Sequence, residues 1–199
     1  MPLRIATPVA DPVPLRSLTV SAPSSGPTRL RVPDLLHATD RAADDVLSGR
    51  CDHLLPAGGV PESRRWFTRI HGDDELDIWL ISWVPGHPTE LHDHGGSLGA
   101  LTVLSGSLNE FRWDGRGLRR RRLDAGDQAG FPLGWVHDVV WAPRPVPGPV
   151  SINKGPVQPT LSVHAYSPPL TAMSYYEVTD RNRLRRQRTE LTDQPEGPQ

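Results

Sequence analysis

From Trp66 onward the sequence alternates between apolar and polar residues with a period of two, and Gly, Pro or Asp interrupt the pattern at short intervals. This period indicates β-strands, because successive side chains of a strand point to opposite faces of the sheet. Many short strands after a single helical segment are typical of an antiparallel barrel or sandwich. The runs that carry the pattern are RWFTRI, LDIWLISWV, ALTVL, SLNEFRW, WVHDVVW, TLSVHAY and MSYYEV.

Composition excludes several classes of protein. The 199 residues suffice for one domain with a sizeable core. A net charge of −1 argues against a general attraction to nucleic acid or to a membrane surface. The single cysteine, Cys51, cannot form an internal disulfide, which fits a reducing cytoplasm. Because no apolar run reaches the length of a membrane span and the first residues lack the apolar core of a signal peptide, we expect a cytoplasmic protein.

The chain divides into three segments by composition. Residues 1–30 are rich in Pro, Ser and Thr and predict a disordered or loosely attached arm. Residues 31–180 predict a single domain, which begins with a short helix over Asp34–Leu47 that Gly49 terminates. Residues 181–199 are polar and end in Pro and Gln, so we expect a disordered tail.

The stretch ELHDHGG contains the first candidate metal ligands. Residues two apart on a strand share a face, so His92 and His94 can converge while Asp93 points away. Two such histidines also occur on half-exposed strands that bind no metal. The spacing of the residues around these two histidines strengthens the metal hypothesis.

Two motifs in this region resemble those of the cupin barrels. The first has Gly86, five residues, the two histidines, four residues, Gly99, six residues and Gly106, and its usual glutamate is replaced by Gly99. The second has Gly126, then Pro-x-Gly and His137, and the asparagine expected four residues later is a tryptophan. The resemblance implies a cupin double-stranded β-helix barrel in which three histidines bind one metal: His92, His94 and His137.

The missing glutamate changes the chemistry expected at the metal. Three neutral imidazoles without a carboxylate leave a divalent ion with its full charge inside a poorly solvated barrel. Such a site favours an anionic ligand, and a thiolate is suitable because a metal strongly lowers the pKa of a thiol. Three protein ligands also leave room for a chelating substrate and O₂. Ligand type alone does not distinguish iron from nickel, copper, zinc or manganese.

A later strand, SVHAYSPP, places three polar side chains on one face. Ser162, His164 and Tyr166 can form a hydrogen-bond chain that ends in a phenol, although the same pattern also describes an ordinary strand with one face in water. This motif, following HDH and a downstream histidine, resembles the cysteine dioxygenase type I family of thiol dioxygenases over roughly residues 65–177. The resemblance implies Fe(II) on the three histidines and a serine–histidine–tyrosine relay beside the substrate.

The resemblance also implies a substrate-binding arginine. In that family an arginine shortly after an aromatic residue pairs with the substrate carboxylate, and Arg69 in WFTR matches this position. A guanidinium fork suits a carboxylate. Phe67 stands where the family often has tyrosine. Animal members cross-link a cysteine to the relay tyrosine, but the matching residue here is Gly99, so we expect Tyr166 without a cross-link.

These observations predict an Fe(II) enzyme that oxidises L-cysteine with O₂ to cysteine sulfinate, as a monomer or weak homo-oligomer. One alternative changes the thiol to 3-mercaptopropionate, although related enzymes tend to have glutamine in place of Arg69. A second alternative is a non-catalytic metal-binding cupin, for which the relay has no evident purpose. A zinc or nickel hydrolase or isomerase is a third, and it would need a carboxylate base near the metal.

Overall fold

One α-helix and two antiparallel β-sheets make up the part of the chain that this computed structural model describes, residues 30–143 and 158–195. The mainly β class with a short N-terminal helix is therefore confirmed. The expected N-terminal arm, except its last residue, lies outside the described residues. No helix within the described ranges is long and apolar enough to cross a membrane.

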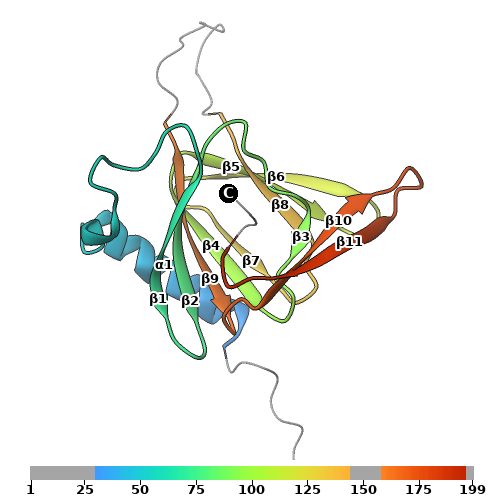
Figure 1. The fold of residues 1–199 in the computed structure, drawn as a ribbon, viewed down its shortest axis with the longest axis horizontal. Helices are drawn as coiled ribbons and strands as arrows, with labels where there is room; N and C mark the ends of the chain where they lie inside the picture. The colour runs from blue at the N-terminus through green and yellow to red at the C-terminus, as the bar shows by residue number, and fades with distance from the viewer. Residues whose placement is uncertain (1–29, 144–157, 196–199) are drawn as a thin grey trace, which may run out of the picture.

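The two sheets face each other and enclose a barrel (Figure 1). The five-stranded sheet has, in spatial order, β1 (Trp66–Gly72), β2 (Asp77–Trp83), β9 (Thr160–Ser167), β4 (Leu98–Ser105) and β7 (Gln128–Phe131). The six-stranded sheet has β11 (Leu184–Leu191), β10 (Ala172–Val178), β3 (His92–Asp93), β8 (His137–Trp141), β5 (Ser107–Trp113) and β6 (Leu118–Asp124). Strands distant in sequence are therefore neighbours in space.

The five-stranded sheet is covered on both faces, which explains its long apolar runs. Along β2, Ile78 and Leu80 pack toward the helix, whereas Trp79, Ile81 and Trp83 pack into the barrel. All seven residues of this strand are buried. The same alternation operates on β9, where Val163 and Ala165 meet the helix. The opposite face of β9 is therefore directed into the barrel.

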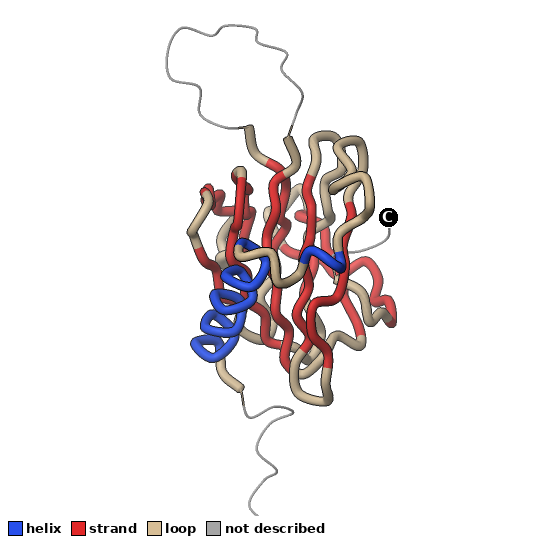
Figure 2. The backbone as a smooth tube through the Cα atoms, turned by 90° about the vertical axis from the view of Figure 1, so that its left-hand side faces the viewer, coloured by secondary structure: helices blue, strands red, loops and turns tan. Residues whose placement is uncertain are grey.

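The helix α1 (Val32–Leu47) lies along the outer face of the five-stranded sheet (Figure 2). It begins two residues earlier than the sequence predicts, because Asp34 caps its start by accepting a hydrogen bond from the backbone N–H of Arg31 at 2.8 Å. Leu35, Ala38 and Ala42 pack against the sheet. A 3₁₀ turn, η1 (Asp52–Leu54), follows α1.

The expected disordered tail over residues 181–199 is wrong for residues 184–191, which form β11 and pair with β10. This strand was missed because it has no apolar alternation. Its ordering comes from the backbone ladder and from side-chain contacts: Arg188 stacks on the ring of Tyr175 at 3.9 Å, and Ser174 and Thr189 share a hydrogen bond of 2.8 Å. A charged edge strand of this kind discourages pairing with other chains.

Replacing Leu35 with Ala should destabilise the fold, because this fully buried side chain fills the interface between α1 and the sheet. We expect a loss of about 2–5 kcal/mol in the free energy of unfolding, measured by urea denaturation. Leu47→Ala, on the same helix but 69% exposed, is the control and should change it by less than about 0.5 kcal/mol. Equal effects of the two variants would contradict this packing.

Candidate metal centre

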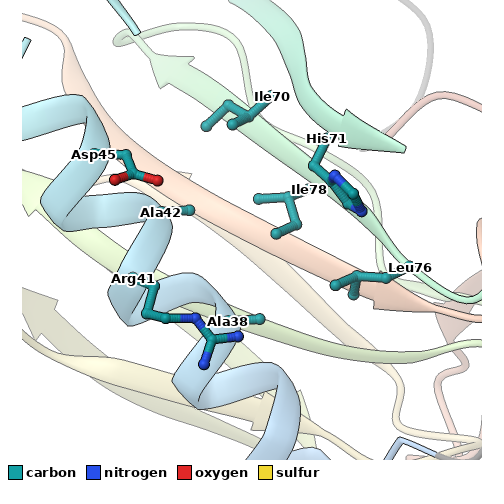
Figure 3. A pocket seen from close by; sticks show the side chains of 8 residues that line it. All are labelled: Ala38, Arg41, Ala42, Asp45, Ile70, His71, Leu76 and Ile78. Atoms are coloured by element: carbon teal, nitrogen blue, oxygen red, sulfur yellow. The ribbon is translucent and has the colours of Figure 1, made fainter. Parts of the chain in front are cut away.

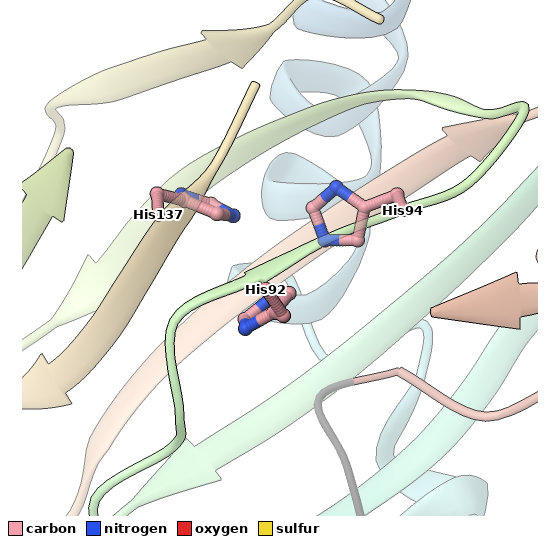
Figure 4. Close-up of side chains that lie close together, drawn as sticks. All are labelled: His92, His94 and His137. Atoms are coloured by element: carbon pink, nitrogen blue, oxygen red, sulfur yellow. The ribbon is translucent and has the colours of Figure 1, made fainter. Parts of the chain in front are cut away.

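Three histidines from the six-stranded sheet and the turn after β3 converge inside the barrel (Figure 4). His92 on β3 is the direct cross-strand partner of His137 on β8. His94 lies two residues after His92 and faces the same point. One ring nitrogen from each residue lies within 4.8 Å of the others, and the three side chains are 0%, 4% and 0% exposed in chain order.

Hydrogen bonds orient two of these rings. The Nδ1 of His92 donates to the backbone carbonyl of Glu90 at 2.7 Å, and the Nδ1 of His137 contacts the carboxylate of Glu110 at 3.2 Å. Each ring thus presents its Nε2 to the cluster. Within the described ranges, the buried Nε2 atoms of His94 and His137 have no hydrogen-bond partner. Buried polar atoms rarely lack one, so the donor set fits a divalent metal.

The turn that follows His94 is held by contacts outside the cluster. Asp93 points away from the cluster and accepts hydrogen bonds from the backbone N–H of Gly95 at 2.9 Å and from the hydroxyl of Tyr176 at 2.6 Å. Gly95 has a φ of +58°, a conformation that L side chains rarely adopt. Asp93 therefore contributes to the shape of the site without facing the metal position.

Burial and neighbouring charge determine the ionisation of the site. Burial lowers the pKa of His94 well below its usual value, and the nearby imidazoles add to this effect. A neutral imidazole is the form that binds metal. Burial alone would raise the pKa of Glu110, but the hydrogen bond and charge of His137, together with Arg121, lower it to about 2. Glu110 is therefore a carboxylate over the whole useful pH range.

The strand β9 places the predicted relay side chains in the same interior. Ser162 contacts His164 between Oγ and Nε2 at 2.9 Å, and the Nδ1 of His164 contacts the hydroxyl of Tyr166 at 3.2 Å. The three side chains are fully buried. Trp83 on β2 is a fourth member of this hydrogen-bond chain, because its indole N–H donates to Ser162 Oγ at 2.8 Å.

Tyr166, at the end of the hydrogen-bond chain, contacts the histidine cluster. Its ring centroid lies 4.9 Å from that of His94. Gly99, its cross-strand partner on β4, leaves room for the phenol ring: a Cβ at this position would lie 3.4 Å from the ring of Tyr166 and 2.9 Å from Phe131. Phe131 in turn packs against His137 with a centroid distance of 4.2 Å and forms an apolar wall.

Arg69 lies on β1, two strands away from the relay. Its cross-strand partner is Trp79, whose own partner on β9 is His164. The guanidinium stacks on the ring of Trp79 at 4.5 Å. It also lies 3.5 Å from the buried carboxylate of Asp77 and 3.8 Å from that of Asp193. Arg69 is thus on the inner face of the sheet, 41% exposed and already near two carboxylates.

Comparison with known proteins supports the motif interpretation. Residues 60–138 match the family model of cysteine dioxygenase type I. The chain resembles that family, as its motifs predict. Cysteine dioxygenase type 1 from Danio rerio is 26% identical over 110 residues, which cover 53% of this chain and 52% of the relative. The chain therefore spans about half the length of this curated relative.

The chain also matches solved structures that are distant from it in sequence. KdgF from Halomonas sp. is 17% identical, with a TM-score of 0.41 over 54% of this chain and 82% of that protein. A cupin superfamily protein from Desulfitobacterium hafniense is 15% identical, with a TM-score of 0.42 over 58% of this chain and 84% of that protein.

Three residues near the site were missed by sequence reasoning: Trp83, Asp77 and Glu110. The alternation of SLNEFRW gave a signal for the last, because it places Glu110 on the same face as the core residue Leu108. Glu90, which is close to His92 in sequence, does not join the cluster with its side chain, because its carboxylate pairs with Arg188 at 2.8 Å. It contributes only its backbone carbonyl to the site.

A groove of about 350 Å³ lies on the other side of the five-stranded sheet, between α1 and strands β1 and β2 (Figure 3). Its floor is apolar and includes Ile70 and Ile78, and Arg41, Asp45 and His71 stand at its rim. Ile78 packs toward the helix, away from the barrel interior. The groove is therefore separate from the histidine cluster.

Replacing His94 with Ala should weaken metal binding by more than about 100-fold, because loss of an outer hydrogen-bond partner alone typically costs 10–100-fold. Metal content after dialysis against Fe(II), Co(II) or Zn(II), measured by mass spectrometry, tests this. His87→Ala is the control, because His87 is an exposed histidine of the preceding loop. Equal metal content in the two variants would argue against a metal centre here.

Proposed function

We propose that the protein is a non-haem Fe(II) thiol dioxygenase that oxidises L-cysteine with O₂ to cysteine sulfinate. The observation that carries this proposal is the meeting of two groups of side chains. A buried set of three imidazoles and a buried hydrogen-bond chain ending in a phenol share one barrel interior, with Tyr166 packed against His94 at 4.9 Å. A binding protein would need the imidazoles alone.

The metal would be held by His92, His94 and His137, whose imidazole nitrogens suit iron among other divalent ions. The resemblance to cysteine dioxygenases favours Fe(II) within that group. Iron held there would supply positive charge that favours the thiolate form of the substrate, and redox chemistry for O₂. Overall, the O–O bond breaks and two S–O bonds form, so that sulfur loses four electrons and O₂ gains them. The sulfinic acid product releases its proton to solvent.

The relay would supply a directed hydrogen bond to the reacting atoms. An indole N–H can only donate, so Trp83 occupies a lone pair of Ser162 and leaves the serine proton for Nε2 of His164. In the tautomer that we propose, the Nδ1 of His164 would carry a hydrogen and donate to the oxygen of Tyr166. The phenol would then use its own proton toward the substrate. Burial of all four hydrogen-bonded side chains excludes water that would compete for these bonds.

Arg69 would hold the substrate carboxylate. Its position on the inner face of β1, in one cross-strand row with Trp79 and His164, directs it toward the barrel. Stacking on Trp79 fixes the plane of the guanidinium, which favours paired hydrogen bonds to a carboxylate. A substrate carboxylate would compete with Asp193, which is 79% exposed and therefore easily displaced.

Anaerobically Fe(II)-loaded protein should consume one O₂ for each L-cysteine and give a product heavier by two oxygen atoms. Oxygen uptake and mass spectrometry measure this. Cysteamine, which lacks the carboxylate that Arg69 would hold, should be a much poorer substrate. Turnover of 3-mercaptopropionate in preference to L-cysteine would retain the dioxygenase and change its thiol. No uptake with any of these thiols by iron-loaded protein would refute the function.

Tyr166→Phe should lower kcat by about 100-fold while leaving iron content unchanged, because it removes one donor aimed at the reacting atoms and no ligand. Trp83→Phe removes only the bond to Ser162 and retains an aromatic ring, so it should cost about 1 kcal/mol, or roughly fivefold in kcat. Steady-state rates and iron content test both variants. Loss of iron in Tyr166→Phe would show that the phenol has a different role.

A further inference from the structure

A buried carboxylate lies directly behind the histidine cluster. Glu110 is on β5, where its side chain is 3% exposed and faces the barrel interior. It lies diagonally across from His137 on β8, since its direct partner there is Val139. Diagonal neighbours on one face are within reach of long side chains. The glutamate therefore reaches the far nitrogen of His137, not the one turned to the cluster.

One carboxylate oxygen of Glu110 faces the histidine cluster, and the other faces the surface. Oε2 accepts from Nε and Nη2 of Arg121 at 3.1 and 2.7 Å. Oε1 accepts from Nδ1 of His137 at 3.2 Å and lies 3.4 Å from the indole Nε1 of Trp135. Arg121 is 52% exposed and comes from β6, directly opposite Glu110. The carboxylate thus links a half-exposed arginine to a fully buried histidine.

We propose that Glu110 is a positioning residue of the metal centre, which orients His137 and supplies negative charge one imidazole away from the metal. The inference rests on the part of the proposed function that assigns a metal to the three histidines. His92 is oriented differently, by the neutral backbone carbonyl of Glu90. A carbonyl fixes a ring but carries no net charge, whereas a carboxylate also strengthens the imidazole as a ligand.

This arrangement modifies the charge expected at the site. The position of the usual motif glutamate is Gly99 on β4, so the five-stranded sheet provides no carboxylate at that point. Glu110 provides one from the six-stranded sheet, at a place where it does not occupy an open metal position. Arg121 holds the carboxylate from the surface and offsets part of its charge. The site therefore retains affinity for an anionic substrate while its ligands are held in place.

The test is metal affinity in Glu110→Gln, measured by competition with a chelator using Co(II) and Zn(II) and no thiol. Glutamine has nearly the same size but no charge. We expect affinity to fall by about 10–100-fold and the visible bands of the Co(II) protein to shift. Asp114→Asn is the matched control, because Asp114 also pairs with an arginine of the same hairpin, at 2.7 Å, and should leave both unchanged.

Arg121→Met provides a second variant that is safer for folding, because half of the arginine side chain is in solvent. It should change metal affinity by a smaller factor, because Glu110 keeps its charge and its contact with His137 but loses the two hydrogen bonds from Arg121. Unchanged affinity and spectrum in Glu110→Gln would overturn the proposal. If that variant does not fold, unchanged affinity in Arg121→Met overturns it instead. Protein that shows the expected dependence on Glu110 but oxidises no thiol would refute the proposed enzyme and retain this inference.

Discussion

The site depends on the pairing of β3 with β8, which sets His92 directly opposite His137. The strand β3 is only two residues long, so its own ladder fixes it weakly. Asp93 holds this segment further, because its carboxylate accepts hydrogen bonds from the hydroxyl of Tyr176 on β10 and from the backbone N–H of Gly95. His94 lies between β3 and the turn at Gly95. Its position therefore depends on contacts that face away from the metal position.

The two sheets contribute different chemistry to one interior. The six-stranded sheet with its β3 turn brings the imidazoles and Glu110, and the five-stranded sheet brings the phenol of Tyr166 and the indole of Trp83. The groups meet only when the sheets pack, and the apolar side chains around them come from both sheets. The site is therefore complete only in the packed barrel. This explains why so many polar side chains are buried with specific partners rather than in water.

Period-two alternation was enough to predict much of the site from sequence. It indicated that His92 and His94 share a face, that Ser162, His164 and Tyr166 share another, and that the domain is mainly β. Motif spacing then indicated His137. The structure brings these residues into one interior because β9 and β3 lie in facing sheets.

Other features depend on strand order, which alternation does not reveal. Trp83 reaches Ser162 from 79 positions away along the chain, and Arg69 has Asp193 beside it through a tail strand that lacks apolar alternation. Glu110 reaches His137 only because β5 and β8 are neighbours. A polar residue in a strand could equally face solvent, so its partner became known only with the fold.

The most direct test of the account is anaerobic addition of L-cysteine to the Co(II)-loaded protein, followed by absorption spectroscopy. If the three histidines leave the metal open to a thiolate, a sulfur-to-cobalt charge-transfer band should appear in the near ultraviolet and saturate at one cysteine per metal. The Co(II)-loaded protein without thiol should lack this band. A spectrum unchanged by cysteine, with cobalt still bound, would contradict a thiol-binding metal centre.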